Sequence, residues 1–97
     1  MDFAMRITED LRKKYDERRA QDAELLALSL DEGRFEVLAR LGHQLKGNAA
    51  TYGYEDLAQL GRKMEQAAEA HSLPEGKQCL YALRAWVQER AGVGEDG

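Results

Sequence analysis

The stretch "LARLGHQLKGNAATY", residues 38–52, repeats mainly apolar side chains at alternating spacings of three and four. An α-helix turns by about 100° per residue, so this spacing places them on one face of a helix. The members of this stripe are Leu38, Leu41, Leu45, Asn48 and Tyr52. The pattern predicts a helix over about residues 34–51 with this face toward a protein core.

The segment before this helix has the same period but carries two stripes. Thr8, followed by Glu9 and Asp10, suits a helix start, because its hydroxyl can accept from a free N–H and acids favour the first turn. The first apolar stripe is rotated relative to the second. The segment is therefore either two helices with a break near residues 18–22 or one long bent helix. Gly33 suits the left-handed position after its end.

A third stripe begins after the break at residues 52–54, where Glu55 and Asp56 open another helix. Its inward positions are Leu57, Leu60 or Gly61, Met64, Ala68 and His71. His71 stands at the end of this stripe, where an imidazole interacts favourably with the helix dipole. We therefore expect a structural role for His71 rather than a catalytic one.

The last helix follows "HSLPEG", residues 71–76, in which Pro74 suits a first helical turn. The core positions of this helix are Cys79, Leu80, Leu83, Trp86 and Val87. Short connections make neighbouring helices antiparallel. The sequence predicts an all-α fold, an antiparallel up-and-down four-helix bundle whose N-terminal segment is an extra or a bent helix. All of residues 1–97 form one domain, with a core over about 7–90 and a flexible tail at 92–97.

Composition excludes several classes of function. The formal net charge of −4 lacks the concentrated basic surface that nucleic acid requires. No apolar run approaches the roughly 18 residues of a membrane span, and the N-terminus has no apolar leader region. The single cysteine fits a reducing compartment. We expect a cytoplasmic monomer that binds neither nucleic acid nor membrane.

The helix phase turns His43 away from the core, because it lies two residues from both Leu41 and Leu45. Helical side chains lean toward the N-terminus, so a side chain at position 47 would cover the imidazole, and Gly47 leaves it uncovered. A glycine inside a helix costs about 1 kcal/mol relative to alanine, which suggests that something large approaches His43. Lys46 offers a cation on the same face. An exposed imidazole is largely neutral at physiological pH and can act as a nucleophile.

The stretch "HQLKGNAATYG", residues 43–53, resembles the H-x-L-K-G signature of histidine phosphotransfer (HPt) domains, and "DLAQLGRKMEQAA", residues 56–68, is similar to the family's following helix. The residues that match the signature are His43, Leu45, Lys46, Gly47 and Gly53. Leu45 and Gly53 are expected to be structural within the motif. Asn48 and Gly61 depart from the residues common in the family, and both lie toward the core, where Asn48 either hydrogen-bonds across the bundle end or fills space.

The resemblance implies that His43 accepts a phosphoryl group on Nε2 from a receiver aspartate or a histidine kinase and passes it to another receiver. Such a carrier is no enzyme by itself and needs no cofactor or metal of its own. Mg²⁺ is expected only in the partner receiver, and Lys46 would support the phosphoryl group. Further residues expected to meet the partner are Ala39, Arg40, Gln44 and Ala50.

Two alternatives remain open from the sequence. One is a helical adaptor that binds receivers without carrying phosphate, and the presence of His43 disfavours it. The other is the excised HPt domain of a hybrid sensor kinase. For the individual residues, the simpler interpretations are an ordinary surface histidine at 43, a solvated lysine at 46 and a packing glycine at 47.

Overall fold

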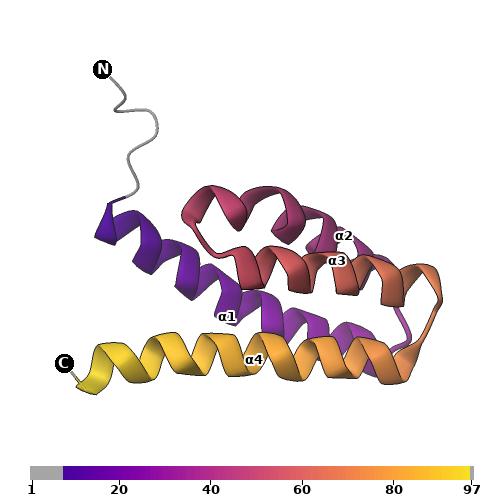
Figure 1. The fold of residues 1–97 in the computed structure, drawn as a ribbon. Helices are drawn as coiled ribbons and strands as arrows, with labels where there is room; N and C mark the ends of the chain where they lie inside the picture. Colours follow the sequence, from indigo (N-terminus) through magenta and orange to yellow (C-terminus); the bar gives the residue numbers. More distant parts are fainter. Residues whose placement is uncertain (1–7, 97) are drawn as a thin grey trace.

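The computed structural model describes the backbone of residues 8–96 and the side chains of residues 8–90. The helices are α1 (Glu9–Asp31), α2 (Phe35–Asn48), α3 (Glu55–Glu69) and α4 (Leu73–Asp96), with a short 3₁₀ turn, η2 (Ala50–Tyr52), after α2. The four helices run alternately in opposite directions, so α1 begins and α4 ends at the same end of the bundle (Figure 1). The predicted all-α, up-and-down four-helix architecture is confirmed.

The N-terminal segment is one helix without a break at residues 18–22. The Thr8 hydroxyl accepts a hydrogen bond from the Leu11 N–H at 3.1 Å, as the predicted cap requires. The polar run inside α1 stays helical because Arg19 and Asp22 form a buried ion pair at 2.7 Å. The Arg19 guanidinium also lies 4.3 Å from the ring centre of Tyr15. The polar residues that suggested a break therefore neutralise one another inside the bundle.

α1 and α3 are each followed by a residue in the left-handed conformation, which is glycine after α1 but histidine after α3. Gly33 has a φ of 72° after α1, as predicted, and the next N–H, of Arg34, donates to the Ser29 carbonyl at 2.8 Å. His71 takes the equivalent position after α3 with a φ of 50°. The prediction that His71 lies on the inward stripe of α3 is therefore wrong. The helix ends at Glu69, so its phase does not extend to His71, which is exposed and packs edge-on against Phe35.

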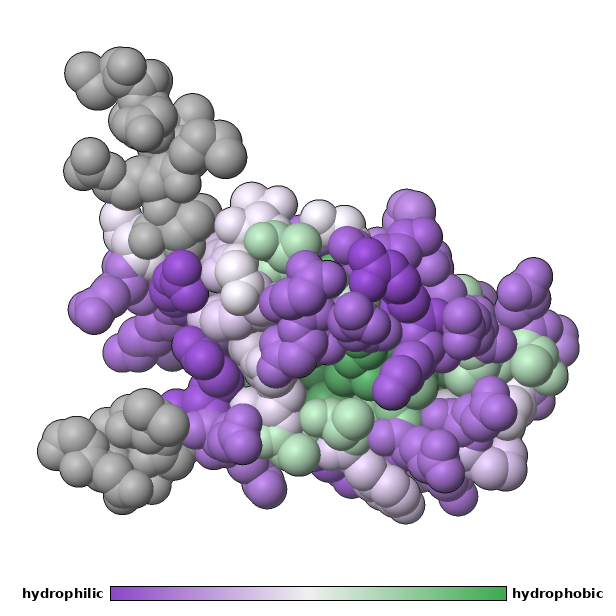
Figure 2. All heavy atoms as spheres, in the orientation of Figure 1, coloured by the Kyte–Doolittle hydropathy of each residue, from purple (hydrophilic) through white to green (hydrophobic). Residues whose placement is uncertain are grey.

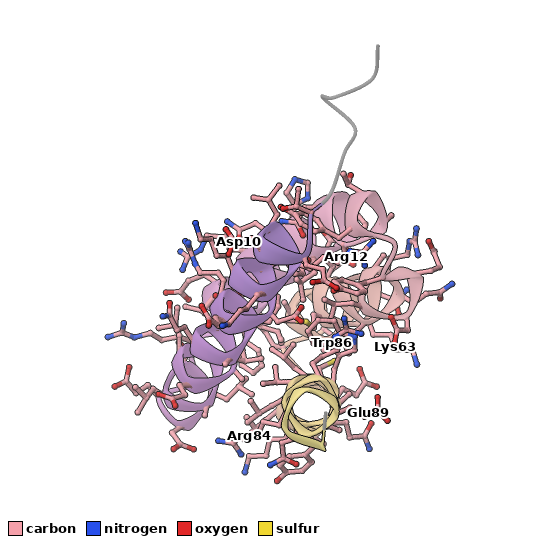
Figure 3. All side chains as sticks on the ribbon, turned by 90° about the vertical axis from the view of Figure 1, so that its left-hand side faces the viewer. Asp10, Arg12, Lys63, Arg84, Trp86 and Glu89 are labelled. Carbon is pink, nitrogen blue, oxygen red and sulfur yellow. The ribbon has the colours of Figure 1, made fainter. Side chains whose placement is uncertain are left out.

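α4 begins at Leu73, with the Ser72 hydroxyl accepting a hydrogen bond from the Glu75 N–H and Pro74 in the first turn. Viewed from the end of the bundle, Trp86 points between the helices, whereas Arg84 and Glu89 lie on the outer side of α4 (Figure 3). The backbone of the helix continues to Asp96, through the stretch where a flexible tail is expected, and the flexibility of that stretch stays a prediction. Glycine weakens a helix by about 1 kcal/mol but, unlike proline, does not block it. Gly97 lies outside the described residues.

The core is built from the predicted stripes. The largest fully buried side chains are Leu26, Leu38, Leu45, Leu57, Met64 and Leu83. Hydrophilic side chains cover most of the face in Figure 2, and hydrophobic ones gather toward its middle. Within the described residues, no helix is long and apolar enough to cross a membrane.

Asn48 and Tyr52, the last two members of the stripe that begins at Leu38, are half-buried and connect α1 to the end of α2. The Tyr15 hydroxyl donates to Asn48 Oδ1 at 2.7 Å, and the Tyr15 ring stacks on Tyr52 with 4.3 Å between ring centres. Of the two interpretations of Asn48, the hydrogen bond across the bundle end is the one observed. This polar contact lies at the edge of an otherwise apolar interface, where an unpaired partner would be costly.

Removing Asn48 should therefore destabilise the protein through Tyr15. We expect Asn48→Ala to lower the free energy of unfolding by about 1–2 kcal/mol, because the Tyr15 hydroxyl loses its acceptor. The same substitution in a Tyr15→Phe background should cost about 1 kcal/mol less, since no hydroxyl is left unpaired. Urea unfolding followed by circular dichroism measures the wild type, the two single variants and the double variant. Strict additivity of the two single effects would contradict the proposed coupling.

Candidate functional site

The site begins with a contact between the backbones of α2 and α3. A Cβ atom placed on Gly61 would lie 2.6 Å from the Lys46 backbone nitrogen and 2.7 Å from the Gly42 carbonyl oxygen. A Cβ on Gly42 would lie 2.7 Å from the Gly61 carbonyl oxygen and 2.9 Å from the Glu65 backbone nitrogen. Real Cβ atoms do not come so close to backbone, so the helices approach this far only because both residues are glycine.

This close approach brings one side chain of α3 to two side chains of α2. Glu65 lies one helical turn after Gly61, and its Oε1 is 2.9 Å from Lys46 Nζ. Its Oε2 is 3.2 Å from His43 Nδ1. One carboxylate thus bridges the candidate nucleophile and the candidate cation. The His43 side chain is nevertheless 75 % exposed, as the helix phase predicts, so its ring stays open to a partner.

The bridge determines which ring nitrogen of His43 is free. The pKa of Glu65 is lowered below its ordinary value, chiefly by the hydrogen bond from Lys46. Desolvation opposes this shift, and the hydrogen bond with His43 adds to it. Glu65 is therefore ionised at neutral pH, and an ionised carboxylate can only accept hydrogen bonds. Nδ1 must then carry the proton of a neutral ring. Nε2 keeps its lone pair and points away from Glu65, as a nucleophile requires.

Glu65 is the residue that the sequence analysis missed. It follows the buried Met64, so the periodicity marks it only as a helix position at the edge of the core. Its role depends on the register between α2 and α3, which no single stripe encodes. The pair of glycines at 42 and 61 is the signal that would have found it, because two glycines on the inner faces of neighbouring antiparallel helices mark a close crossing.

The glycines near His43 have different surroundings. A Cβ on Gly47 would meet nothing within 4 Å, so Gly47 is not a packing glycine within the described part of the chain. Gly53 ends η2 in the left-handed region with a φ of 84°, which fits the structural role expected of it. Gly61, the departure from the family pattern, is required for the crossing rather than harmful to the packing.

The other residues predicted for the partner surface follow the same face of α2 and η2. Arg40, Gln44 and Ala50 are exposed and Ala39 is half-buried, whereas Leu45 is buried beneath them in the core. Residues 40, 43, 44 and 47 are three or four apart and therefore neighbours on the helix surface. Among the described residues, no group of three or more His, Cys, Asp or Glu side chains could hold a metal ion.

The structure is thus a helical bundle that presents an exposed imidazole, held by a carboxylate, on a helix face. A family model for the Hpt domain matches residues 8–92, and the chain therefore belongs to the Hpt family. Members of this family carry phosphoryl groups in phosphorelays and interact with receiver domains there. The resemblance stated from the sequence is confirmed. A comparison with curated proteins and one with solved structures found no match.

Replacement by alanine should change the free energy of unfolding in opposite directions at Gly61 and Gly47. We expect Gly61→Ala to lower the free energy of unfolding by about 1–3 kcal/mol, because the new methyl group meets backbone atoms that cannot move aside. Gly47→Ala should raise it by up to about 1 kcal/mol through helix propensity alone. Urea unfolding of both variants measures the difference. Equal effects of the same sign would contradict the assignment of Gly61 to the crossing.

The lowered pKa of Glu65 links its contribution to pH. A carboxyl group whose pKa is lower in the folded state stabilises the fold above its ordinary value of about 4.3 and loses this contribution as the pH falls through the folded value. The difference in unfolding free energy between the wild type and Glu65→Gln should therefore shrink as the pH falls below about 4.3. Urea unfolding at pH 7 and pH 3 tests this, with Glu17→Gln on α1 as the control. A difference that does not change with pH would contradict the bridge.

Proposed function

We propose that this protein is a phosphorelay carrier in which His43 Nε2 accepts a phosphoryl group from a receiver aspartyl phosphate, or from a histidine kinase, and passes it to a second receiver aspartate. The observation that carries the proposal is the Glu65 contact to Nδ1 at 3.2 Å, which leaves Nε2 unprotonated on an exposed ring. Membership of the Hpt family supports it independently.

Phosphoryl transfer from the aspartyl phosphate to Nε2 requires no proton to leave the imidazole ring. The lone pair of Nε2 forms the N–P bond as the O–P bond of the aspartyl phosphate breaks, and the carboxylate leaves with the electron pair. The ring gains positive charge because Nδ1 keeps its proton. The Glu65 carboxylate already lies against that N–H, so it stabilises the charge where it develops. Onward transfer reverses these changes.

Lys46 places a second charge beside the reaction. Its ammonium group is held by Glu65 at 2.9 Å and is 40 % exposed, so it remains accessible to phosphoryl oxygens arriving at the ring. The fixed ion pair keeps the cation near His43 before the partner binds. The chain would supply orientation and charge, and the partner receiver would supply Mg²⁺ and the reacting carboxylate.

The docking face follows from the exposure around His43. Arg40, Gln44 and Ala50 surround the imidazole, and the open space over Gly47 would admit the partner. A transient carrier of this kind would act as a monomer with a modest contact area. We place it in the cytoplasm, in keeping with the free, buried Cys79.

Replacing the proposed nucleophile should abolish phosphate uptake. We expect His43→Gln to take up no acid-labile phosphate from a panel of radiolabelled receivers, because glutamine cannot form the phosphoimidazole. Circular dichroism should show the same helical content as the wild type, since the side chain is exposed.

The second histidine offers a matched control. His71→Gln makes the same exchange at an exposed position that supplies no nucleophile in the proposed transfer, so it should reach the same final extent of labelling as the wild type, whatever its rate. Label on His43→Gln, or its loss from His71→Gln alone, would show that the phosphorylated residue has been assigned wrongly.

A further inference from the structure

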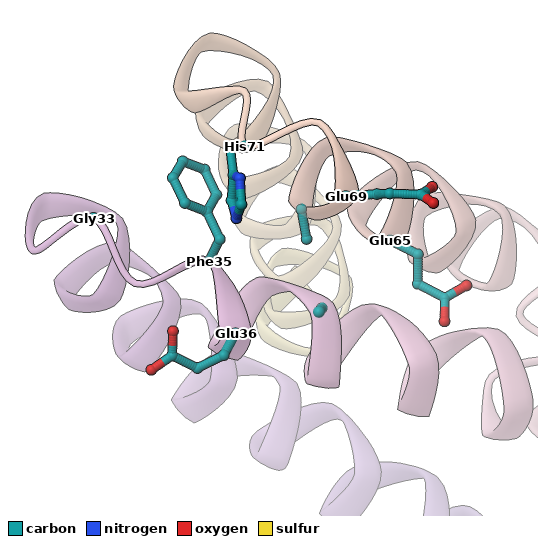
Figure 4. Close-up of a pocket in the computed structure, with 8 residues that line it drawn as sticks. Gly33, Phe35, Glu36, Glu65, Glu69 and His71 are labelled. Carbon is teal, nitrogen blue, oxygen red and sulfur yellow. The ribbon is translucent and has the colours of Figure 1, made fainter.

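A groove lies beside the His43 site, between α2 and α3. It has a volume of about 620 Å³ and is open to solvent. Phe35 and His71 stand side by side at one end. The Glu36 side chain extends from α2 toward one side of the view, and those of Glu65 and Glu69 extend from α3 toward the other side (Figure 4). The groove thus has a rim of three glutamates, whose charges are negative.

The charge of the rim is unbalanced. The lining contains three glutamates and neither lysine nor arginine. Lys46 neutralises Glu65, but no ion pair within the described residues engages Glu36 or Glu69. Both are exposed. The groove would therefore attract a cation and repel an anionic partner surface.

Small apolar side chains line the groove between the carboxylates. Ala39 and Ala68 contribute only methyl groups to it, and the Phe35 and His71 rings, with 5.1 Å between their centres, close one end. A lysine or arginine side chain matches both parts, because its aliphatic stem packs on apolar surface while its charged head reaches carboxylates.

The groove is continuous with the candidate phosphorylation site. Glu65 lines the groove and also contacts His43 and Lys46, and Ala39 belongs both to the groove and to the predicted partner surface. A domain that brings an aspartate to His43 Nε2 therefore lies within reach of the groove.

We propose that this groove binds a lysine or arginine side chain of the receiver domain and thereby selects which receivers exchange phosphate with His43. The inference rests on the proposed function and adds the chemistry of its partner. The favoured receivers carry a basic side chain within an apolar patch near the reacting aspartate. Charge complementarity of this kind acts mainly on the association rate and on the choice of partner.

The test removes the two unpaired negative charges of the groove and leaves His43, Lys46 and Glu65 unchanged. The groove variant is Glu36→Gln with Glu69→Gln, and the control variant is Glu17→Gln with Glu89→Gln. Glu17 and Glu89 are exposed on α1 and α4, so the control loses the same net charge away from the groove. Rapid-quench transfer from labelled receivers gives the second-order rate constant and the rate at saturating receiver for each variant.

We expect the groove variant to lower the second-order rate constant by about five- to tenfold at low salt, since steering by charge is then strongest. The rate at saturating receiver should not change. The deficit should vanish near 0.5 M salt, and the control should behave like the wild type at every salt concentration. A groove variant that matches the wild type, or a control that loses as much, would overturn the groove proposal.

Potassium phosphoramidate separates this proposal from the function on which it rests. This small donor phosphorylates imidazole without a protein partner, so the wild type and the groove variant should be labelled equally. Reduced labelling of the groove variant would assign the effect to His43 reactivity and overturn the docking role. If phosphoramidate labels the wild type but none of the receivers does, both the receiver partnership and the groove proposal would be overturned. A wild type labelled by neither donor would overturn the proposed function itself.

Discussion

The absence of side chains at Gly42 and Gly61 is the constraint on which the site depends. Helices that pack through side chains lie 8–10 Å apart, whereas here a Cβ on either glycine would lie within 3 Å of the neighbouring backbone. Glycine in a helix costs about 1 kcal/mol, so the chain accepts this cost at two facing positions. The close crossing fixes the distance at which one glutamate can contact both His43 and Lys46. A wider crossing would leave the imidazole without its carboxylate and the lysine without its anchor.

Gly47 and Gly61 show that glycine has two different roles in this protein. Gly61 is buried, and its missing side chain admits a backbone of the same chain. Gly47 is exposed, and its missing side chain leaves space that nothing in the described chain fills. The helix phase alone separates the two, because residue 47 falls outside the stripe and residue 61 within one. The sequence could therefore predict which glycine faces solvent, but it could not show that Gly42 is the partner of Gly61.

The periodicity of the sequence predicted the features that depend on a single helix, such as its buried face. It missed the features that depend on contacts between two helices. The buried face of α2 and the exposure of His43 follow from spacing alone, since burial imposes the period. The break suggested near residues 18–22 does not occur, because Arg19 and Asp22 cancel their charges in a contact that a hydropathy pattern cannot represent. His71 was misplaced because a stripe carries no information on where a helix stops. Glu65 was missed because interhelical register lies outside any one stripe.

The charges around His43 oppose one another in a way that suits a carrier. In the proposed relay, Lys46 and the oriented ring would favour arrival of a phosphoryl group, whereas the net charge of −4 and the exposed Glu36 and Glu69 would disfavour its retention. A site with only cations would hold the phosphoryl group too firmly to pass it on. The Lys46 cation is partly neutralised by Glu65, so its attraction is local and moderate. In the proposed relay, opposing charges of this kind would suit reversible transfer, because neither arrival nor release of the phosphoryl group would be strongly preferred.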